Sequence, residues 1–335
     1  ILPSDDDFYS LPAPHVLENW NVFLPNGAFW RPIDAAWGIL MGKCVGAFPY
    51  LNHLMVLLLF AFCVYGLSKM LGYCRVGGMS KTLAIGMLLL SPALVATVYS
   101  IDSINQVLCT ASVLFYRKHK VVSYLMMILA LFSKESGIAW LVATPLLSLV
   151  LEEERQDTVC VDLKKYKLLI KPYIVSLLII GGYFVLRLLL RQPEAMEASG
   201  NYAGGLGLNS LMGLGMLMGI SLTAVDTVAL FLERNWIVVI ASVVVSLAFL
   251  LLLLRKIICL KKNNWLRLLE CLMITMMLTA PHLVMGHPGE MHAFPTLWGV
   301  ALSVGVVLKK VQWSKWEKNV IVIFLLCCIL VYLHK

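Results

Sequence analysis

Three consecutive carboxylates, Asp5, Asp6 and Asp7, stand near the start of a chain that is otherwise mostly apolar. Closely spaced carboxylates can act as a general base, orient an acceptor hydroxyl or hold a cation. A solvated acidic loop that also caps a helix is the simpler alternative. The residues by themselves leave both interpretations open.

An arginine between an aromatic ring and a proline forms a second candidate, in Trp30-Arg31-Pro32. A guanidinium group suits phosphate recognition because it donates two parallel hydrogen bonds. The alternatives are that Arg31 binds lipid headgroups at a membrane interface or pairs with Asp34 nearby.

Lys134 and Glu135 interrupt an apolar stretch. Charges near the hydrocarbon of a membrane are unfavourable unless they are paired or functional. A tight turn between two helices that exposes an ion pair is the alternative interpretation.

Imidazoles and a carboxylate gather late in the chain, at His282, His287, Glu290 and His292. The spacing from His287 to His292 is not that of a helical zinc motif, so we expect contact with a phosphate or a developing charge rather than a metal.

Asp102 and Gln106 lie one helical turn apart at the start of an apolar stretch. They are therefore able to face the same cavity. A helix cap is the alternative role for Asp102.

The composition sets the class of protein that must position these residues. The chain has 335 residues, 60% hydrophobic and 14% charged, with a mean hydropathy of +0.84, values that are typical of a polytopic membrane protein. The net charge of +8 comes from short basic clusters at helix ends, so we expect no nucleic-acid partner. The nine cysteines show no metal-ligand spacing.

The pattern predicts an all-α, polytopic transmembrane helix bundle over 1–335, forming one domain. Residues 1–49 form a large extracytoplasmic loop with an interfacial helix at 35–48, and 50–335 form the bundle. We expect a first transmembrane helix before residue 1. The predicted apolar segments are 51–71, 82–99, 104–116, 121–132, 138–151, 172–190, 211–232, 237–254, 266–285, 294–308 and 320–333.

Positive charge predicts the orientation of this bundle. With the acidic loop outside, the basic segments 75–81, 117–120 and 155–171 all fall inside. The later basic segments follow the same rule if 211–232 is re-entrant or tangential instead of crossing. The count then brings the acidic loop, Lys134 with Glu135, and the late histidines to the outer face of the membrane.

The order of these motifs resembles the integral-membrane GT-C glycosyltransferases, and most closely the protein O-mannosyltransferase-like branch that includes the tetratricopeptide-containing enzymes. The resemblance covers about residues 5–150. The matching pieces are Asp6-Asp7, Arg31-Pro32, Pro49-Tyr50-Leu51-Asn52-His53, Ser91-Pro92 and Ser133-Lys134-Glu135-Ser136.

The resemblance implies transfer of a sugar from a polyprenyl-phosphate donor to a protein, lipid or glycan acceptor at the extracytoplasmic face, with inversion at the anomeric carbon. It implies Asp6 or Asp7 as general base, Arg31 and Lys134 on the donor phosphate, and no cofactor or metal. The cavity would be lined by Asp5, His53, Asp102, Gln106, Glu135, Glu290 and His292.

The chain departs from the family in two places. The family's His-Pro turn stands here as Ser91-Pro92, and its late Glu-Arg-Tyr-like loop stands as Glu290-Met291-His292, without the arginine. A transporter, a lipid-linked oligosaccharide polymerase or ligase, and a non-enzymatic membrane scaffold are the alternatives. A transporter usually contains inverted repeats, and the two halves of this chain show no internal similarity.

Overall fold

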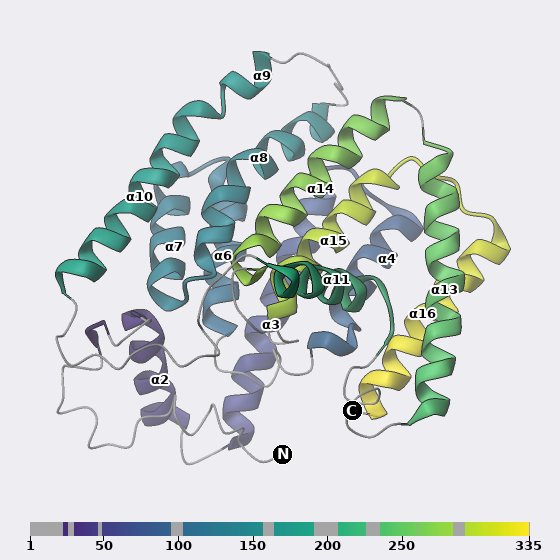
Figure 1. Ribbon diagram of the computed structural model, residues 1–335, viewed down its shortest axis with the longest axis horizontal. Helices are drawn as coiled ribbons and strands as arrows, with labels where there is room; N and C mark the ends of the chain where they lie inside the picture. Colours follow the sequence, from purple (N-terminus) through teal and green to yellow (C-terminus); the bar gives the residue numbers. More distant parts are fainter. Residues whose placement is uncertain are drawn as a thin grey trace.

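The regular structure of the chain is helical throughout its described part. The computed structural model (Figure 1) describes residues 23–25, 30–45, 49–94, 103–156, 164–190, 207–225, 235–260, 262–283 and 292–334. Within these ranges no strand occurs, which confirms the predicted all-α class.

The helices follow the apolar segments of the sequence closely. Their bounds are α2 (Pro32–Val45), α3 (Pro49–Tyr73), α4 (Gly78–Leu89), the 3-10 turn η3 (Pro92–Leu94), α6 (Ser103–Tyr116), α7 (Lys120–Ser133), α8 (Gly137–Gln156), α9 (Lys164–Lys167), α10 (Ile170–Leu189), α11 (Leu208–Leu222), α13 (Trp236–Ile258), α14 (Lys262–Leu283), α15 (Ala293–Val307) and α16 (Lys315–His334).

Five of these helices, α3, α10, α13, α14 and α16, are long and apolar enough to cross a membrane. This is what an integral membrane protein requires. The large apolar side chains of α10 are mostly exposed, for example Leu178 and Leu188 at 70% each. Exposed leucines on a helix of this length suit contact with lipid tails.

Two predicted segments end earlier than expected. The segment predicted at 82–99 is wrong at its end, because α4 stops at Leu89 and a separate buried 3-10 turn follows at Pro92–Leu94. Proline restricts the residue before it to non-helical conformations and has no N–H to continue a helix. The glycine-rich segment predicted at 211–232 forms a helix only to Leu222, after which the backbone of Thr223 is extended.

The charged connections between helices sort into two ends of the bundle. At one end, Ser80 at the start of α4 donates a hydrogen bond to the Leu308 carbonyl after α15, at 2.7 Å. Lys256 near the end of α13 pairs there with Glu317 at the start of α16, with Nζ and Oε1 2.7 Å apart. We call this the basic end, because the α3–α4 and α6–α7 connections, and the helix ends beside the α9–α10 and α13–α14 connections, add further lysines and arginines.

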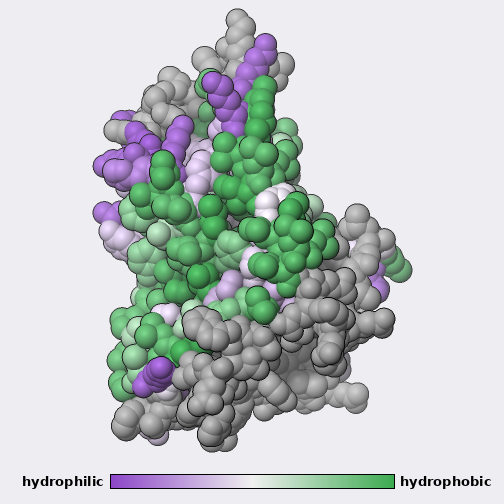
Figure 2. All heavy atoms as spheres, turned by 90° about the vertical axis from the view of Figure 1, so that its left-hand side faces the viewer, coloured by the Kyte–Doolittle hydropathy of each residue, from purple (hydrophilic) through white to green (hydrophobic). Residues whose placement is uncertain are grey.

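The opposite end carries the start of α2, the α7–α8 turn and the last residues of α10 (Figure 1). Figure 2 shows hydrophilic residues gathered mainly in the upper part of one face, above a broad hydrophobic band. This segregation of charge agrees with the pattern of basic loops that the sequence predicts.

Helix α15 forms the centre of the bundle, and 14 of its 15 residues are buried. A Cβ added at Gly299 would lie 3.1 Å from the Cα of Thr275, so α14 and α15 approach closely at this point. Hydroxyl groups join the two helices, with Oγ1 of Thr279 3.0 Å from Oγ1 of Thr296. Small residues and shared hydroxyl hydrogen bonds are the usual means of packing helices in a membrane.

Helix α11 lies crosswise to α13 in Figure 1, and it packs against α14 and α15. It has 15 residues, fewer than the roughly 20 that a crossing needs. Its direction and length are those expected of the re-entrant or tangential segment that the charge count predicts.

Candidate functional site

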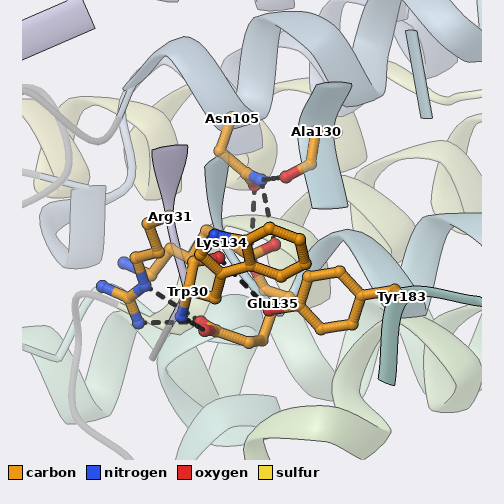
Figure 3. Close-up of polar contacts among 8 residues, drawn as sticks. Trp30, Arg31, Asn105, Ala130, Lys134, Glu135 and Tyr183 are labelled. Carbon is orange, nitrogen blue, oxygen red and sulfur yellow. Dashed lines mark hydrogen bonds and ion pairs between the residues drawn. The ribbon is translucent and has the colours of Figure 1, made fainter. Parts of the chain in front are cut away.

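The site is organised by an ion pair between two turns that are far apart in the sequence. Arg31, directly before α2, donates from Nε and Nη2 to Oε2 of Glu135, which lies between α7 and α8, and both distances are 2.9 Å (Figure 3). The two side chains are 29% and 24% exposed, so the pair is neither fully solvated nor fully buried. The partner of the guanidinium in this contact is thus a carboxylate 104 residues away in the sequence.

The same carboxylate also fixes the backbone before α2. Oε1 of Glu135 accepts a hydrogen bond from the backbone N–H of Trp30 at 3.3 Å, and the Trp30 carbonyl accepts one from the Tyr183 hydroxyl at 3.2 Å. Glu135 therefore uses one oxygen for Arg31 and the other for the residue before it. Charge-assisted hydrogen bonds of this kind hold an arginine in one orientation.

Aromatic rings cover the inner side of this ion pair. Trp30 stacks on Tyr183 with ring centroids 5.7 Å apart and meets Phe132 edge to face at 4.9 Å. Trp30 and Tyr183 are buried, at 7% and 2% exposure. Rings that exclude water lower the local dielectric constant, which strengthens the electrostatic contacts beside them.

A buried asparagine shapes the turn that carries Lys134 and Glu135. Nδ2 of Asn105, in the first turn of α6, donates to the carbonyl of Ala130 at 2.7 Å and to the carbonyl of Lys134 at 3.4 Å. Its Oδ1 accepts from the Ser136 hydroxyl at 3.3 Å. One side chain thus holds the end of α7 and both sides of the turn.

The turn also depends on Gly137, the first residue of α8. A Cβ at this position would lie 2.9 Å from the backbone nitrogen of Leu131 and 3.0 Å from the carbonyl carbon of Ala130. Backbone atoms cannot move aside as the end of a flexible side chain can. Glycine therefore lets α8 begin directly against α7. The stretch forms two separate helices and not one broken helix, and the turn between them carries Lys134 and Glu135 at the end of the bundle.

Lys134 lies within electrostatic range of His282, in the last turn of α14. Its backbone is extended at φ −155° and ψ 139°, and its side chain is half-buried. Lys134 lies close enough to His282 for the two groups to interact electrostatically. The rings of His282 and His292 have centroids 5.0 Å apart.

The structure brings the predicted site residues Arg31, Lys134 and Glu135 together around the α7–α8 turn, and it places the predicted His292 beside His282. His53 is buried near the start of α3, and Gln106 is half-buried next to Asn105; their place in the site stays a prediction. The predicted residues Asp5, Asp6, Asp7, Asp102 and Glu290 lie outside the described residues.

Sequence reasoning assigned no site role to Trp30, Asn105 or Tyr183, whereas His282 belongs to the late histidine cluster that it predicts. A signal existed for Asn105, because an amide inside an apolar helix needs a partner. No comparable signal marked Tyr183, which stands among leucines in α10 and meets Trp30 only through the fold.

The described charged side chains around the α7–α8 turn suit an anion. Among the described residues, no group of three histidine, cysteine, aspartate or glutamate residues is placed to hold a metal. Arg31 and Lys134 are two positive charges against the one negative charge of Glu135, which leaves one net positive charge. Helix α8 also begins directly after this turn, and the N-terminus of a helix attracts negative charge.

No protein-family model, curated protein or solved structure matches this chain.

Proposed function

We propose that this protein is an integral-membrane glycosyltransferase of GT-C type, which moves a sugar from a polyprenyl-phosphate donor to an acceptor at the extracytoplasmic face. The observation that carries the proposal is the meeting of Arg31, Lys134 and Glu135 at the end of the bundle opposite the basic end. The motif order of residues 5–150 adds the family resemblance.

The chemistry of the donor accounts for the location of this cluster. A polyprenyl tail partitions into hydrocarbon, its phosphate stays at the membrane surface, and the acceptor arrives from water. An active site for such a donor belongs at one end of a helix bundle, where polar groups are reached from an apolar surface. The exposed leucines of α10 provide the apolar surface. The half-buried Arg31 provides the polar group, and it follows Trp30, whose carbonyl binds Tyr183 of α10.

The proposed reaction needs a cation and a base. As the bond between the anomeric carbon and the phosphate oxygen breaks, its electron pair moves to the phosphate, where Lys134 would stabilise the growing charge while Arg31, held by Glu135, keeps the turn that carries Lys134 in place. The acceptor hydroxyl forms the new bond from the opposite face, and its proton passes to Asp6 or Asp7. Because Glu135 is committed to Arg31 and Trp30, it holds the cation in place and does not serve as the base.

A transporter is the second candidate, because α14 contains buried ionisable residues. Arg267 pairs with Glu270 at 2.5 Å, both are 3% exposed, and His282 is buried near the other end of the same helix. Buried ionisable groups in a membrane helix are a feature of ion and proton pathways. However, Glu270 also accepts from the Tyr166 hydroxyl of α9 at 2.6 Å, which gives this cluster a structural role in holding α9 to the bundle.

The test is transfer of radiolabelled sugar from a panel of polyprenyl-phosphate sugars by the purified full-length protein. We expect turnover of one donor, lost in Asp6→Asn or Asp7→Asn and kept in Asp162→Asn, a carboxylate between α8 and α9 in the sequence. The acceptor that becomes labelled separates a protein or lipid glycosyltransferase from an oligosaccharide polymerase or ligase. Absence of turnover across the panel, with or without donor binding, would overturn the proposal and leave transport to be tested in proteoliposomes.

A further inference from the structure

His282 is a buried imidazole whose hydrogen-bonding capacity is unused within the described part of the chain. It follows Pro281 in the last turn of α14 and is 3% exposed. Neither Nδ1 nor Nε2 has a hydrogen-bond partner among the described residues. A neutral imidazole carries one N–H donor and one acceptor, so both are removed from water without compensation.

Its polar neighbours one turn deeper do not show this deficit. Thr279, on the same face of α14, shares a hydrogen bond with Thr296 of α15 and donates to the Thr275 carbonyl at 2.8 Å. The helix interface is therefore able to satisfy its own hydroxyl groups. The His282 ring lies at the end of that interface, in the last turn of α14.

Three features around His282 attract negative charge. His292 precedes α15 as its N-cap residue, and its ring lies beside that of His282. The first turn of α15, a helix of 15 residues, has backbone N–H groups without partners in the helix. Lys134 approaches from the α7–α8 turn and interacts electrostatically with the His282 ring.

We propose that His282, Lys134 and the N-terminus of α15 form a phosphate-binding site. An oxygen of the anion would accept a hydrogen bond from the imidazole N–H of His282, while Lys134 and the α15 N-terminus offset the negative charge of the anion. A cation is disfavoured here because Lys134 repels it. The inference rests on the proposed function only in taking a polyprenyl chain as the group that carries the phosphate, since binding of the phosphate itself requires neither a sugar nor an acceptor.

This site divides the roles of the two cations. The ion pair between Arg31 and Glu135 fixes the α7–α8 turn from outside. The hydrogen bond from Asn105 to the Lys134 carbonyl fixes the same turn from inside. Both contacts determine where Lys134 lies relative to His282. Lys134 is then the cation that contacts the phosphate, and Arg31 acts as a positioning residue through Glu135.

The test measures thermal unfolding and binding of the full-length protein in detergent with two probes, inorganic phosphate and farnesyl phosphate, at constant ionic strength. We expect at least one probe to raise the midpoint of unfolding of the wild type. His282→Leu should weaken binding of that probe by about tenfold or more, because a hydrogen bond to a charged group is lost. His119→Leu, at the basic end, should bind it as the wild type does.

The unfolding temperature of the His282→Leu variant without ligand also shows whether that variant is folded. Leucine fills the site without polar atoms, so the ligand-free His282→Leu protein should unfold at the same temperature as the wild type or higher. Stabilisation by farnesyl phosphate alone would identify a lipid-borne phosphate, and stabilisation by both probes would identify a site for phosphate in general. Either result supports the site.

No stabilisation by either probe, or equal binding by His282→Leu and wild type, would overturn the site. Binding without any sugar transfer would leave the site standing and remove the glycosyltransferase proposal. The two proposals can therefore fail separately.

Discussion

The carboxylate of Glu135 holds the guanidinium of Arg31 across 104 residues of sequence, with Nε and Nη2 each 2.9 Å from Oε2. This contact ties the start of α2 to the turn between α7 and α8. It also places a positive charge, a negative charge and Lys134 within one end of the bundle.

Removing the Arg31–Glu135 pair should reveal a coupling between the two side chains. In a double-mutant cycle with Arg31→Ala and Glu135→Ala, we expect an interaction free energy of about 1 kcal/mol, modest because both groups are partly solvated. The measurement is the free energy of unfolding in detergent. Strictly additive single effects would show that the pair does not stabilise the fold.

Replacing Asn105 should loosen the α7–α8 turn. Asn105→Leu removes the donor for the Ala130 and Lys134 carbonyls, and we expect a loss of about 1–3 kcal/mol in the free energy of unfolding. Asn105→Asp should be no better, because a carboxylate is not a donor. As control, Thr82→Ala at the exposed start of α4 should change stability by less than about 0.5 kcal/mol.

A methyl group at Gly137 should disturb the packing of α8 on α7. The new Cβ would lie about 3 Å from backbone atoms of Leu131, so we expect Gly137→Ala to destabilise the protein by about 1–3 kcal/mol. At Gly181 in α10, a Cβ would meet no atom within 4 Å. Gly181→Ala should therefore leave the unfolding temperature unchanged or raise it, and a similar loss in both variants would refute the steric explanation.

Lys134 should matter for transfer far more than for stability. If it stabilises charge on the departing phosphate, Lys134→Ala should lower kcat/KM for the active donor by about 100-fold. Lys167→Ala, an exposed lysine of α9, is the matched control. A Lys134→Ala enzyme with wild-type kcat/KM would exclude contact between this lysine and the donor phosphate.

The two ends of α10 should lie on opposite sides of the membrane. We expect single cysteines at Leu168 and Leu190 to react with a membrane-impermeant reagent from different sides, with Leu190→Cys reached from the extracytoplasmic side. The exposed native Cys44 and Cys259, and Cys160 between α8 and α9 in the sequence, are first replaced by serine. Labelling of both positions from one side would show that α10 does not cross.

The hydropathy of the sequence was sufficient to predict most of the helices. Long apolar segments and the prolines, glycines and charges between them placed α3, α6, α10, α13, α15 and α16 within a few residues of their ends. Local rules explain this success, since helix formation and span length depend on residues close in the chain. The same rules missed the end of α4, where Pro92 stops the helix after an apolar run that continues in the sequence.

The sequence by itself also singled out Arg31, Lys134 and Glu135, because charges inside or beside apolar segments are exceptional. It did not determine their partners: the tertiary structure alone joins Arg31 to Glu135, sets Asn105 under the turn and brings Lys134 to His282. Periodicity indicates which residues share a face of one helix, but it does not indicate which other helix packs against that face. That choice follows from the packing of all the helices together, through close approaches such as Gly137 on α7 and Gly299 on α14.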